Sequence, residues 1–282
     1  MLAASRSHQS AALLWFERAR AAGLLQVEPV ADYEGLARTI AQYAELPCDY
    51  ADASLIALAE ASGVTADKIA VVRNSADIKG FTPGPKPEDL LKRHGLEGKF
   101  IAAYIGTIGM AHGLGTILAA AERMKVDAGI AFLLVGDGAE REALERQARE
   151  CGLDNVIFAG SVGKADVLRY WRLSDASLVL LRDRPVFRHV LPSKMFEAMA
   201  TETPIVLGVL GESAELLETS GTGIVIQPES AEALVHAIER LAADPEAAKE
   251  MGRKGRRLVE TEFDRDKLAA QMLEELRSVA AA

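Results

Sequence analysis

The chain has 282 residues, of which 49% are hydrophobic and 5% aromatic, and its formal net charge is −9. This length fits one large or two smaller domains, and the low aromatic content suits helices packed on a parallel sheet. This excess of acidic residues is not typical of a nucleic-acid binder, which needs a basic surface. Cys48 and Cys151 match no metal or redox spacing, and no apolar run approaches the roughly 20 residues of a membrane span. We therefore expect a cytoplasmic protein whose membrane contact, if any, is peripheral and at the inner face.

Residues 1–64 have a mostly helical pattern, and one stretch within them is distinctive. Residues 46–55, LPCDYADASL, are followed by ALAE and resemble the later part of a PIN domain, a metal-dependent nuclease fold. The resemblance implies a metal-binding carboxylate at Asp52, with Asp49 nearby, because divalent cations need several oxygen ligands. We find no strand among these residues that would carry the family's first acid, and where its last acid is expected the chain reads IAVVRNSADIKGF. We therefore expect Asp49 and Asp52 to cap a helix, with a PIN-type ribonuclease remnant as an alternative.

Strand-like and helix-like segments alternate from residue 65 onwards. Continuously apolar runs predict buried strands at residues 69–72, 100–105, 132–135, 156–158, 176–181, 204–207 and 224–226. Amphipathic stretches between them predict helices, and the chain ends in two helices broken around Phe263 and Asp264. This alternation is typical of an α/β fold with a doubly wound parallel sheet. Right-handed crossovers would place the loops that follow the strands on one carboxyl edge.

A glycine-rich turn follows the strand predicted at residues 100–105. Gly106, Gly109, Gly113 and Gly115 lie between this strand and an apolar helix. Strand, glycine turn and helix together allow backbone N–H groups to approach a diphosphate closely. The spacing is not GxGxxG, and no acidic residue stands where it would bind the ribose of a dinucleotide, so a plain NAD site is disfavoured.

Residues 191–208, LPSKMFEAMATETPIVLG, combine a loop, a helix and a strand. The first turn of such a helix offers free backbone N–H groups and a positive dipole, which favour phosphate. Lys194 adds a full positive charge, and Glu197 supplies a carboxylate that can accept hydrogen bonds from sugar hydroxyls. The i, i+3 spacing also fits a surface ion pair on an ordinary helix, so both interpretations are open at this point.

A series of motifs runs in order from about residue 65 to the end: GTIGMAHGL, FLLVGDGAE, NVIFAG, SDASLVLL, PSKMFEAMATETPIV, GES, GTGIVIQPES and MGRKGRRLVETEF. Together they resemble the nucleotide-sugar donor lobe of GT-B glycosyltransferases, in the large retaining family four. The GMAHGL and PSKMFEAMA forms resemble the branch that builds bacterial surface polysaccharides with UDP-linked amino or deoxy sugars. The resemblance implies a Rossmann-like lobe, a UDP-sugar or GDP-sugar donor, a glycan or lipid-linked acceptor, no cofactor and no metal.

The same resemblance implies roles for individual residues. Glu197 would accept hydrogen bonds from the ribose hydroxyls, and Lys194 would offset charge on the leaving nucleoside diphosphate, which makes these two the candidate catalytic residues. The donor-binding candidates are Gly106, Thr107, Gly109, Met110, Gly136, Asp137, Val162, Arg188, His189, Ser193, Gly211 and Glu212. Many members carry two glutamates eight positions apart, but the partner position of Glu197 is His189 in this chain. A substituted loop fits this departure, and so does a donor contact made by Arg188 and His189.

The sequence predicts two parts, a helical PIN-like fragment at residues 1–64 and a donor-binding domain at residues 65–282. About 64 residues are too few for the acceptor lobe that a GT-B enzyme needs. We therefore expect this chain to bind the donor but to catalyse little alone, and a separate acceptor-lobe protein is one partner that would complete it. A gene fusion and a truncated gene product both fit, and a non-catalytic nucleotide-sugar-binding module is the alternative function. The sugar, the base, the acceptor and the oligomeric state stay open.

Overall fold

The computed structural model describes residues 73–281 of the chain. Three predictions concern residues outside this range: the helical PIN-like fragment over residues 1–64, the capping role of Asp49 and Asp52, and the strand at residues 69–72. They stay predictions, as does the domain boundary placed between the two parts.

Within the described residues, six parallel strands form one sheet in the order β3-β2-β1-β4-β5-β6. They are β1 (Phe100–Ile105), β2 (Ile130–Val135), β3 (Val156–Gly160), β4 (Ala176–Leu180), β5 (Ile205–Gly208) and β6 (Gly223–Val225). β1 pairs along its whole length with β2, whereas its pairing with β4 joins Ala102 to Ala176 and Ala103 to Ser177. This order confirms the predicted doubly wound α/β sheet, because the chain winds outward from β1 in both directions.

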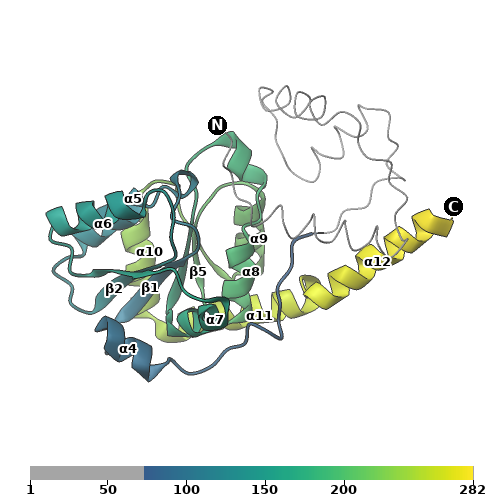
Figure 1. Ribbon diagram of the computed structural model, residues 1–282, viewed down its shortest axis with the longest axis horizontal. Coiled ribbons are helices and arrows are strands. Elements are labelled where there is room, and N and C mark those ends of the chain that lie inside the picture. The colour runs from purple at the N-terminus through teal and green to yellow at the C-terminus, as the bar shows by residue number, and fades with distance from the viewer. Residues whose placement is uncertain (1–72, 282) are drawn as a thin grey trace. The chain divides into compact units, whose positions relative to one another are not determined.

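Helices cover both faces of the sheet (Figure 1). They are α4 (Glu88–His94), α5 (Gly115–Arg123), α6 (Arg141–Glu150), α7 (Lys164–Leu173), α8 (Ser193–Ala200), α9 (Glu212–Ser220), α10 (Ala231–Ala243), α11 (Pro245–Glu262) and α12 (Arg265–Ala281). Short 3₁₀ helices, η2 (Met110–His112) and η3 (Pro185–His189), interrupt the loops after β1 and β4. Helices α5, α6 and α10 cover one face of the sheet, and α7, α8 and α9 cover the other. None of these described helices is both long and apolar enough to cross a membrane.

The central strands are buried because both faces of the sheet are covered. Every residue of β2, β4 and β5 is buried, and so is β1 after its first residue. Ala103 belongs to the core beneath α7 and α8, whereas its neighbours Ala102 and Tyr104 belong to the core beneath α5 and α10. A strand covered on both faces favours apolar residues at nearly every position, with the buried Ser177 of β4 as an exception. This is why mainly apolar runs predicted these strands. The ends differ by a residue or two, and β2 begins at Ile130 rather than at residue 132.

Arg256, on α11, ties the segment that precedes α4 to the end of α8. Its guanidinium donates to the backbone carbonyls of Ile78 at 3.1 Å, Phe81 at 2.8 Å and Ala200 at 2.7 Å. The Arg256 side chain is only 15% exposed, so these bonds form largely away from bulk water. The segment before α4 is therefore packed as part of the folded domain.

Candidate functional site

The strand order reverses between β1 and β4, which is the position at which open α/β sheets bind ligands. Arg182 joins the loops that follow these two strands. Its backbone N–H donates to the Ala111 carbonyl at 2.9 Å, and its Nε donates to the Met110 carbonyl at 2.5 Å. Its guanidinium also lies 3.6 Å from the Glu140 carboxylate and 3.8 Å from the Glu229 carboxylate. The glycine turn after β1 is therefore held in place from the loop after β4.

Gly106 and Gly136 directly follow the neighbouring strands β1 and β2 and pack backbone against backbone. Both have a positive φ, 149° and 139°. A Cβ on Gly136 would lie 1.9 Å from the Gly106 carbonyl oxygen, and a Cβ on Gly138 would lie 2.3 Å from that of Ile108. Ile108 also donates its N–H to the Asp137 carbonyl at 2.9 Å. The turns after β1 and β2 interlock only because side chains are absent at these positions, so this part of the edge presents backbone.

Lys194 points its ammonium group at this glycine turn. α8 begins at Ser193, and Lys194 Nζ lies 3.1 Å from the position that a Cβ on Gly106 would occupy. The Lys194 side chain as a whole is half-buried, but Nζ itself is buried, lies 4.0 Å from the centre of the Tyr104 ring, and has no hydrogen-bond partner in the described part of the chain. Burial lowers the pKa of Lys194 to about 7, and the charge of Glu197 opposes this shift.

His112, in η2, lies beside Tyr104. The centres of the two rings are 5.7 Å apart in an edge-on arrangement, and His112 Nδ1 lies 3.4 Å from the Leu180 carbonyl oxygen. Burial, and then the charge of Lys194, lower the pKa of His112 to about 4. The imidazole is therefore neutral near pH 7 and adds no second positive charge next to Lys194.

Glu197 lies one helical turn after Lys194 and accepts a hydrogen bond from a buried indole. Trp171 Nε1, on α7, donates to Glu197 Oε2 at 3.1 Å. Burial raises the pKa of Glu197, while the Trp171 N–H and then the charges of Arg265, Lys194 and Lys164 oppose this. Because Lys194 Nζ has no partner among the described residues, the surface ion pair that the i, i+3 spacing allowed does not form.

The other candidates from the first three loops lie along the same edge. Gly109 precedes η2 in an extended conformation, and Thr107 and Met110 on either side of it are exposed. Asp137 Oδ1 accepts the N–H of the following residue at 2.8 Å, and Val162 packs against the core after β3. Thr107, Gly109 and Met110 therefore belong to the turn that Lys194 faces, whereas Asp137 and Val162 follow strands one and two positions further out.

The candidates after β4 and β5 lie on the other side of the reversal in strand order. Arg188 is exposed, and its guanidinium lies 3.8 Å from the Asp183 carboxylate. A Cβ on Gly211, whose φ is 85°, would lie 2.0 Å from the Arg188 carbonyl oxygen. His189 is the last residue of η3, and Glu212 is the first residue of α9. The structure thus packs η3 against the turn that begins α9.

Tyr104, His112, Trp171 and Arg182 lie beside the candidate residues but were not assigned roles from the sequence. Tyr104 is the one residue with a polar side chain in the run FIAAYI, and Trp171 is one of two tryptophans in the chain. His112 stands inside the GMAHGL motif. These sequence features mark the residues as unusual, but they do not indicate which residues their side chains contact.

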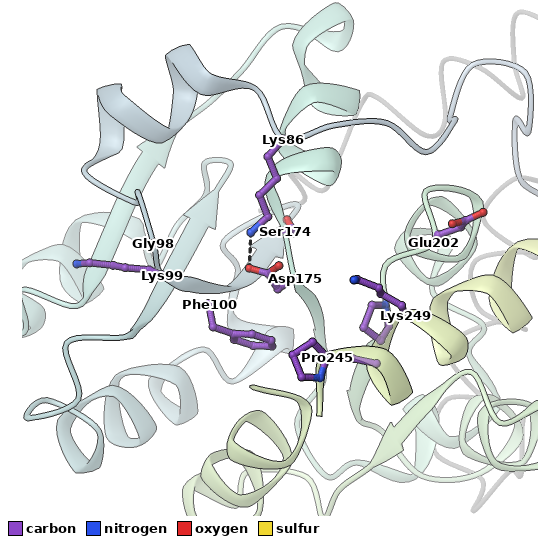
Figure 2. Close-up of a pocket in the computed structure, with 11 residues that line it drawn as sticks. Lys86, Gly98, Lys99, Phe100, Ser174, Asp175, Glu202, Pro245 and Lys249 are labelled. Carbon is purple, nitrogen blue, oxygen red and sulfur yellow. Dashed lines mark hydrogen bonds and ion pairs between the residues drawn. The ribbon is translucent and has the colours of Figure 1, made fainter. Parts of the chain in front are cut away.

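A pocket of about 330 Å³ lies at the opposite, amino edge of the sheet (Figure 2). Its lining includes Phe100 at the start of β1, Asp175 just before β4 and Pro204 just before β5. Lys86 Nζ lies 2.6 Å from the Asp175 carboxylate, as the dashed line in Figure 2 marks. No candidate site residue lines this pocket, so it is separate from the candidate site. Within the described residues, no group of three or more His, Cys, Asp or Glu side chains could hold a metal ion.

Comparison with known proteins identifies the family of the chain. Residues 87–258, more than half of the chain, match the family described as "Glycosyl transferases group 1". The chain belongs to this family. One relative is the GDP-mannose-dependent alpha-(1-6)-phosphatidylinositol monomannoside mannosyltransferase of Mycobacterium tuberculosis. The two sequences are 30% identical over 212 residues, and the alignment covers 73% of this chain and 55% of the relative. The chain spans about half the length of the curated relatives it matches.

Two solved structures share the fold of this chain. Sucrose-phosphate synthase from Thermosynechococcus elongatus aligns with a TM-score of 0.65 and 27% identity over 75% of this chain and 53% of that one. Anabaena Alr3699/HepE in complex with UDP aligns with a TM-score of 0.69 over 81% of this chain and 62% of that one, and its 21% identity carries the fold alone. The predicted Rossmann-like, GT-B-type glycosyltransferase fold is therefore confirmed. The PIN-like resemblance of residues 46–55 stays a prediction.

Proposed function

We propose that this chain binds the nucleoside diphosphate of a sugar donor at the loops after β1 and β4, and that it serves in transfer of the sugar to an acceptor. The observation that carries the proposal is the buried ammonium of Lys194, which faces the turn at Gly106 and has no hydrogen-bond partner among the described residues. A cation that is removed from water without a counter-ion destabilises the folded state. A diphosphate would supply the counter-ion, and a glycine at 106 lets a phosphate oxygen approach more closely than a larger residue would.

The start of α8 adds a second attraction for negative charge. Ser193 and Lys194 are the first two residues of this helix, so their backbone N–H groups precede the intrahelical hydrogen bonds. These groups, together with the positive end of the helix dipole, favour a bound phosphate. The side chain and the backbone of Lys194 would thus act on the same ligand.

The proposed reaction places negative charge next to Lys194. The bond between the anomeric carbon of the sugar and the diphosphate oxygen breaks, and the acceptor hydroxyl oxygen forms the new bond to that carbon and releases its proton. The diphosphate leaves with the electron pair of the broken bond. An ammonium already held in position beside that oxygen lowers the barrier, because no reorganisation is needed as the charge develops. Glu197 would accept a hydrogen bond from a ribose hydroxyl and so orient the nucleotide.

The proposal also covers the acceptor and the place of action. The mycobacterial relative, by its name, uses GDP-mannose and acts on a phosphatidylinositol monomannoside, which supports a lipid-linked acceptor. Because the chain spans about half of such relatives, we assign it the donor side of the reaction. The acceptor would then be held by further polypeptide or by a separate acceptor-lobe protein, at the inner face of the cytoplasmic membrane.

Calorimetric titration of the full chain with UDP and with GDP tests the donor site. We expect at least one of the two to bind, and the substitution Lys194→Met to weaken binding by about tenfold or more, as loss of a charged contact does. The matched control is Lys249→Met, because Lys249 lies on α11 at the other edge, paired with Glu246 at 2.8 Å. If wild type bound neither nucleotide, or if Lys194→Met bound as tightly as wild type, the proposal would be wrong.

A further inference from the structure

We propose that Trp171 is a positioning residue that sets the preference of this site for a ribose over a deoxyribose, by holding the Glu197 carboxylate in one orientation. The inference rests on the proposed function, since it assumes that Glu197 meets the sugar of a nucleotide. Trp171 lies near the end of α7, outside the loops that follow the strands at the carboxyl edge.

Trp171 has one polar atom, and the structure uses it on Glu197. The indole is fully buried in the core beneath α7 and α8. Its Nε1–H donates to Glu197 Oε2 at 3.1 Å. An indole can donate but cannot accept, so this contact also favours the ionised carboxylate over the neutral acid. Burial alone would favour the neutral acid and raises the pKa of Glu197.

The second oxygen of the same carboxylate is left for a ligand. Glu197 Oε1 has no hydrogen-bond partner in the described part of the chain. The buried side-chain atoms that lack a partner there are Asn155 Oδ1, Ser177 Oγ, Lys194 Nζ and Ser213 Oγ, and Glu197 Oε1 is not one of them. Oε1 therefore keeps contact with solvent while Oε2 is anchored. The carboxylate presents one free acceptor in a defined direction, one helical turn from the Lys194 ammonium.

A carboxylate anchored by one oxygen discriminates better than a free one. A ribose hydroxyl donates to Oε1 at the cost of little side-chain entropy, because the indole has already fixed the Glu197 rotamer. A deoxyribose cannot donate at that position and leaves Oε1 unpaired after desolvation, which is costly. Without the indole N–H, the carboxylate could rotate and take up a proton more readily. Discrimination between the two sugars should then fall, even where the nucleotide still binds.

The test compares Trp171→Phe with Tyr170→Phe in the full chain. Phenylalanine keeps an aromatic ring in the core but removes the N–H donor. Tyr170 is the matched control, because it precedes Trp171 on α7, is 3% exposed, and its hydroxyl lies 3.1 Å from His94 Nε2 away from the carboxylate. Each variant is titrated with whichever of UDP and GDP wild type binds more tightly, and with its 2′-deoxy and 3′-deoxy forms.

We expect wild type and Tyr170→Phe to prefer the ribonucleotide over at least one deoxy form by about tenfold, and Trp171→Phe to reduce that ratio to about twofold or less. A second readout needs no ligand: the indole N–H proton resonance of Trp171, identified by its loss in Trp171→Phe, should shift as Glu197 titrates and stay constant in Glu197→Gln. If the nucleotide binds but Trp171→Phe keeps the wild-type ratio, the inference is overturned while the proposed function stands. If wild type binds neither nucleotide, both are overturned.

Discussion

The ammonium nitrogen of Lys194 lies 4.0 Å from the centre of the Tyr104 ring and has no hydrogen-bond partner in the described residues. The face of an aromatic ring attracts a cation, but by less than a carboxylate does. Tyr104 therefore holds the ammonium without neutralising it. The Tyr104 hydroxyl is occupied elsewhere, since it donates to the Thr107 carbonyl at 2.6 Å. Stability and ligand affinity should both depend on the protonation of Lys194.

Lys194→Met should stabilise the unliganded chain at neutral pH. The pKa of Lys194 is about 7 in the folded chain and near 10.5 once it unfolds. Below pH 7 Lys194 is protonated in both the folded and the unfolded chain, so the buried charge lowers the free energy of unfolding by its full amount. Between pH 7 and 10 the unfolded chain binds the proton and the folded chain does not, so the free energy of unfolding rises with pH. We expect Lys194→Met to raise Tm by about 5 °C at pH 6.5, and the gap to close towards pH 10.

Thermal unfolding of both proteins from pH 6.5 to 10 measures this difference. Lys249→Met serves as the control, because the Lys249 side chain is 63% exposed and should leave Tm unchanged at every pH. A wild-type chain more stable than Lys194→Met at pH 6.5 would mean that the ammonium is already neutralised without a ligand.

Nucleotide affinity should fall as the pH rises above 7. Free Lys194 loses its proton at a pKa of about 7, whereas a bound diphosphate would favour the ammonium and hold the proton to higher pH. Binding therefore takes up a proton, and affinity declines by up to about tenfold per pH unit. The neighbouring His112, with a pKa of about 4, stays neutral throughout. Calorimetry at pH 7, 8 and 9, in buffers with different ionisation enthalpies, counts the protons, and equal affinity at all three would contradict the prediction.

The strands and their order of appearance were predictable from the sequence because burial on both faces imposes continuous apolar runs. The sequence IAFLLV of β2 is buried at all six positions. The carboxyl edge followed from the same reasoning, since each glycine-rich turn comes directly after such a run. Strand ends were less predictable, because residues such as Ile130 and Gly208 join the sheet through pairing with a neighbour that the local sequence does not identify.

The partners of the candidate residues could not be predicted in the same way. The i, i+3 spacing of Lys194 and Glu197 allowed an ion pair, but each side chain meets a different element. Lys194 meets Tyr104 of β1, and Glu197 meets Trp171 of α7, which are 90 and 26 positions earlier in the chain. Contacts between distant positions depend on how helices pack over the strands. A local pattern shows which side chains could pair, but not which of the available partners lies closer.

Gly136→Ala should prevent the turns after β1 and β2 from packing. The added Cβ would lie 1.9 Å from the Gly106 carbonyl oxygen, and the φ of 139° is unfavourable for alanine. We expect a loss of more than about 3 kcal/mol in the free energy of unfolding, or no folded protein. Gly115→Ala is the control, since nothing lies within 4 Å of its Cβ position at the start of α5. That change should be neutral or slightly stabilising, and equal effects of the two changes in urea unfolding would refute this account.

Arg256→Met should destabilise the domain by about 2 to 4 kcal/mol, because it leaves three backbone carbonyls without their donor. These are the carbonyls of Ile78, Phe81 and Ala200, and the Arg256 side chain that serves them is 15% exposed. Arg253→Met is the matched control three residues earlier on α11, where Arg253 makes an exposed pair with Glu250 at 2.8 Å. That loss should stay within about 0.5 kcal/mol. Urea unfolding measures both changes, and hydrogen exchange should show faster exchange before α4 in Arg256→Met only. If Arg256→Met and Arg253→Met were equally stable, water would satisfy the three carbonyls as well as the Arg256 guanidinium does, and the prediction would be wrong.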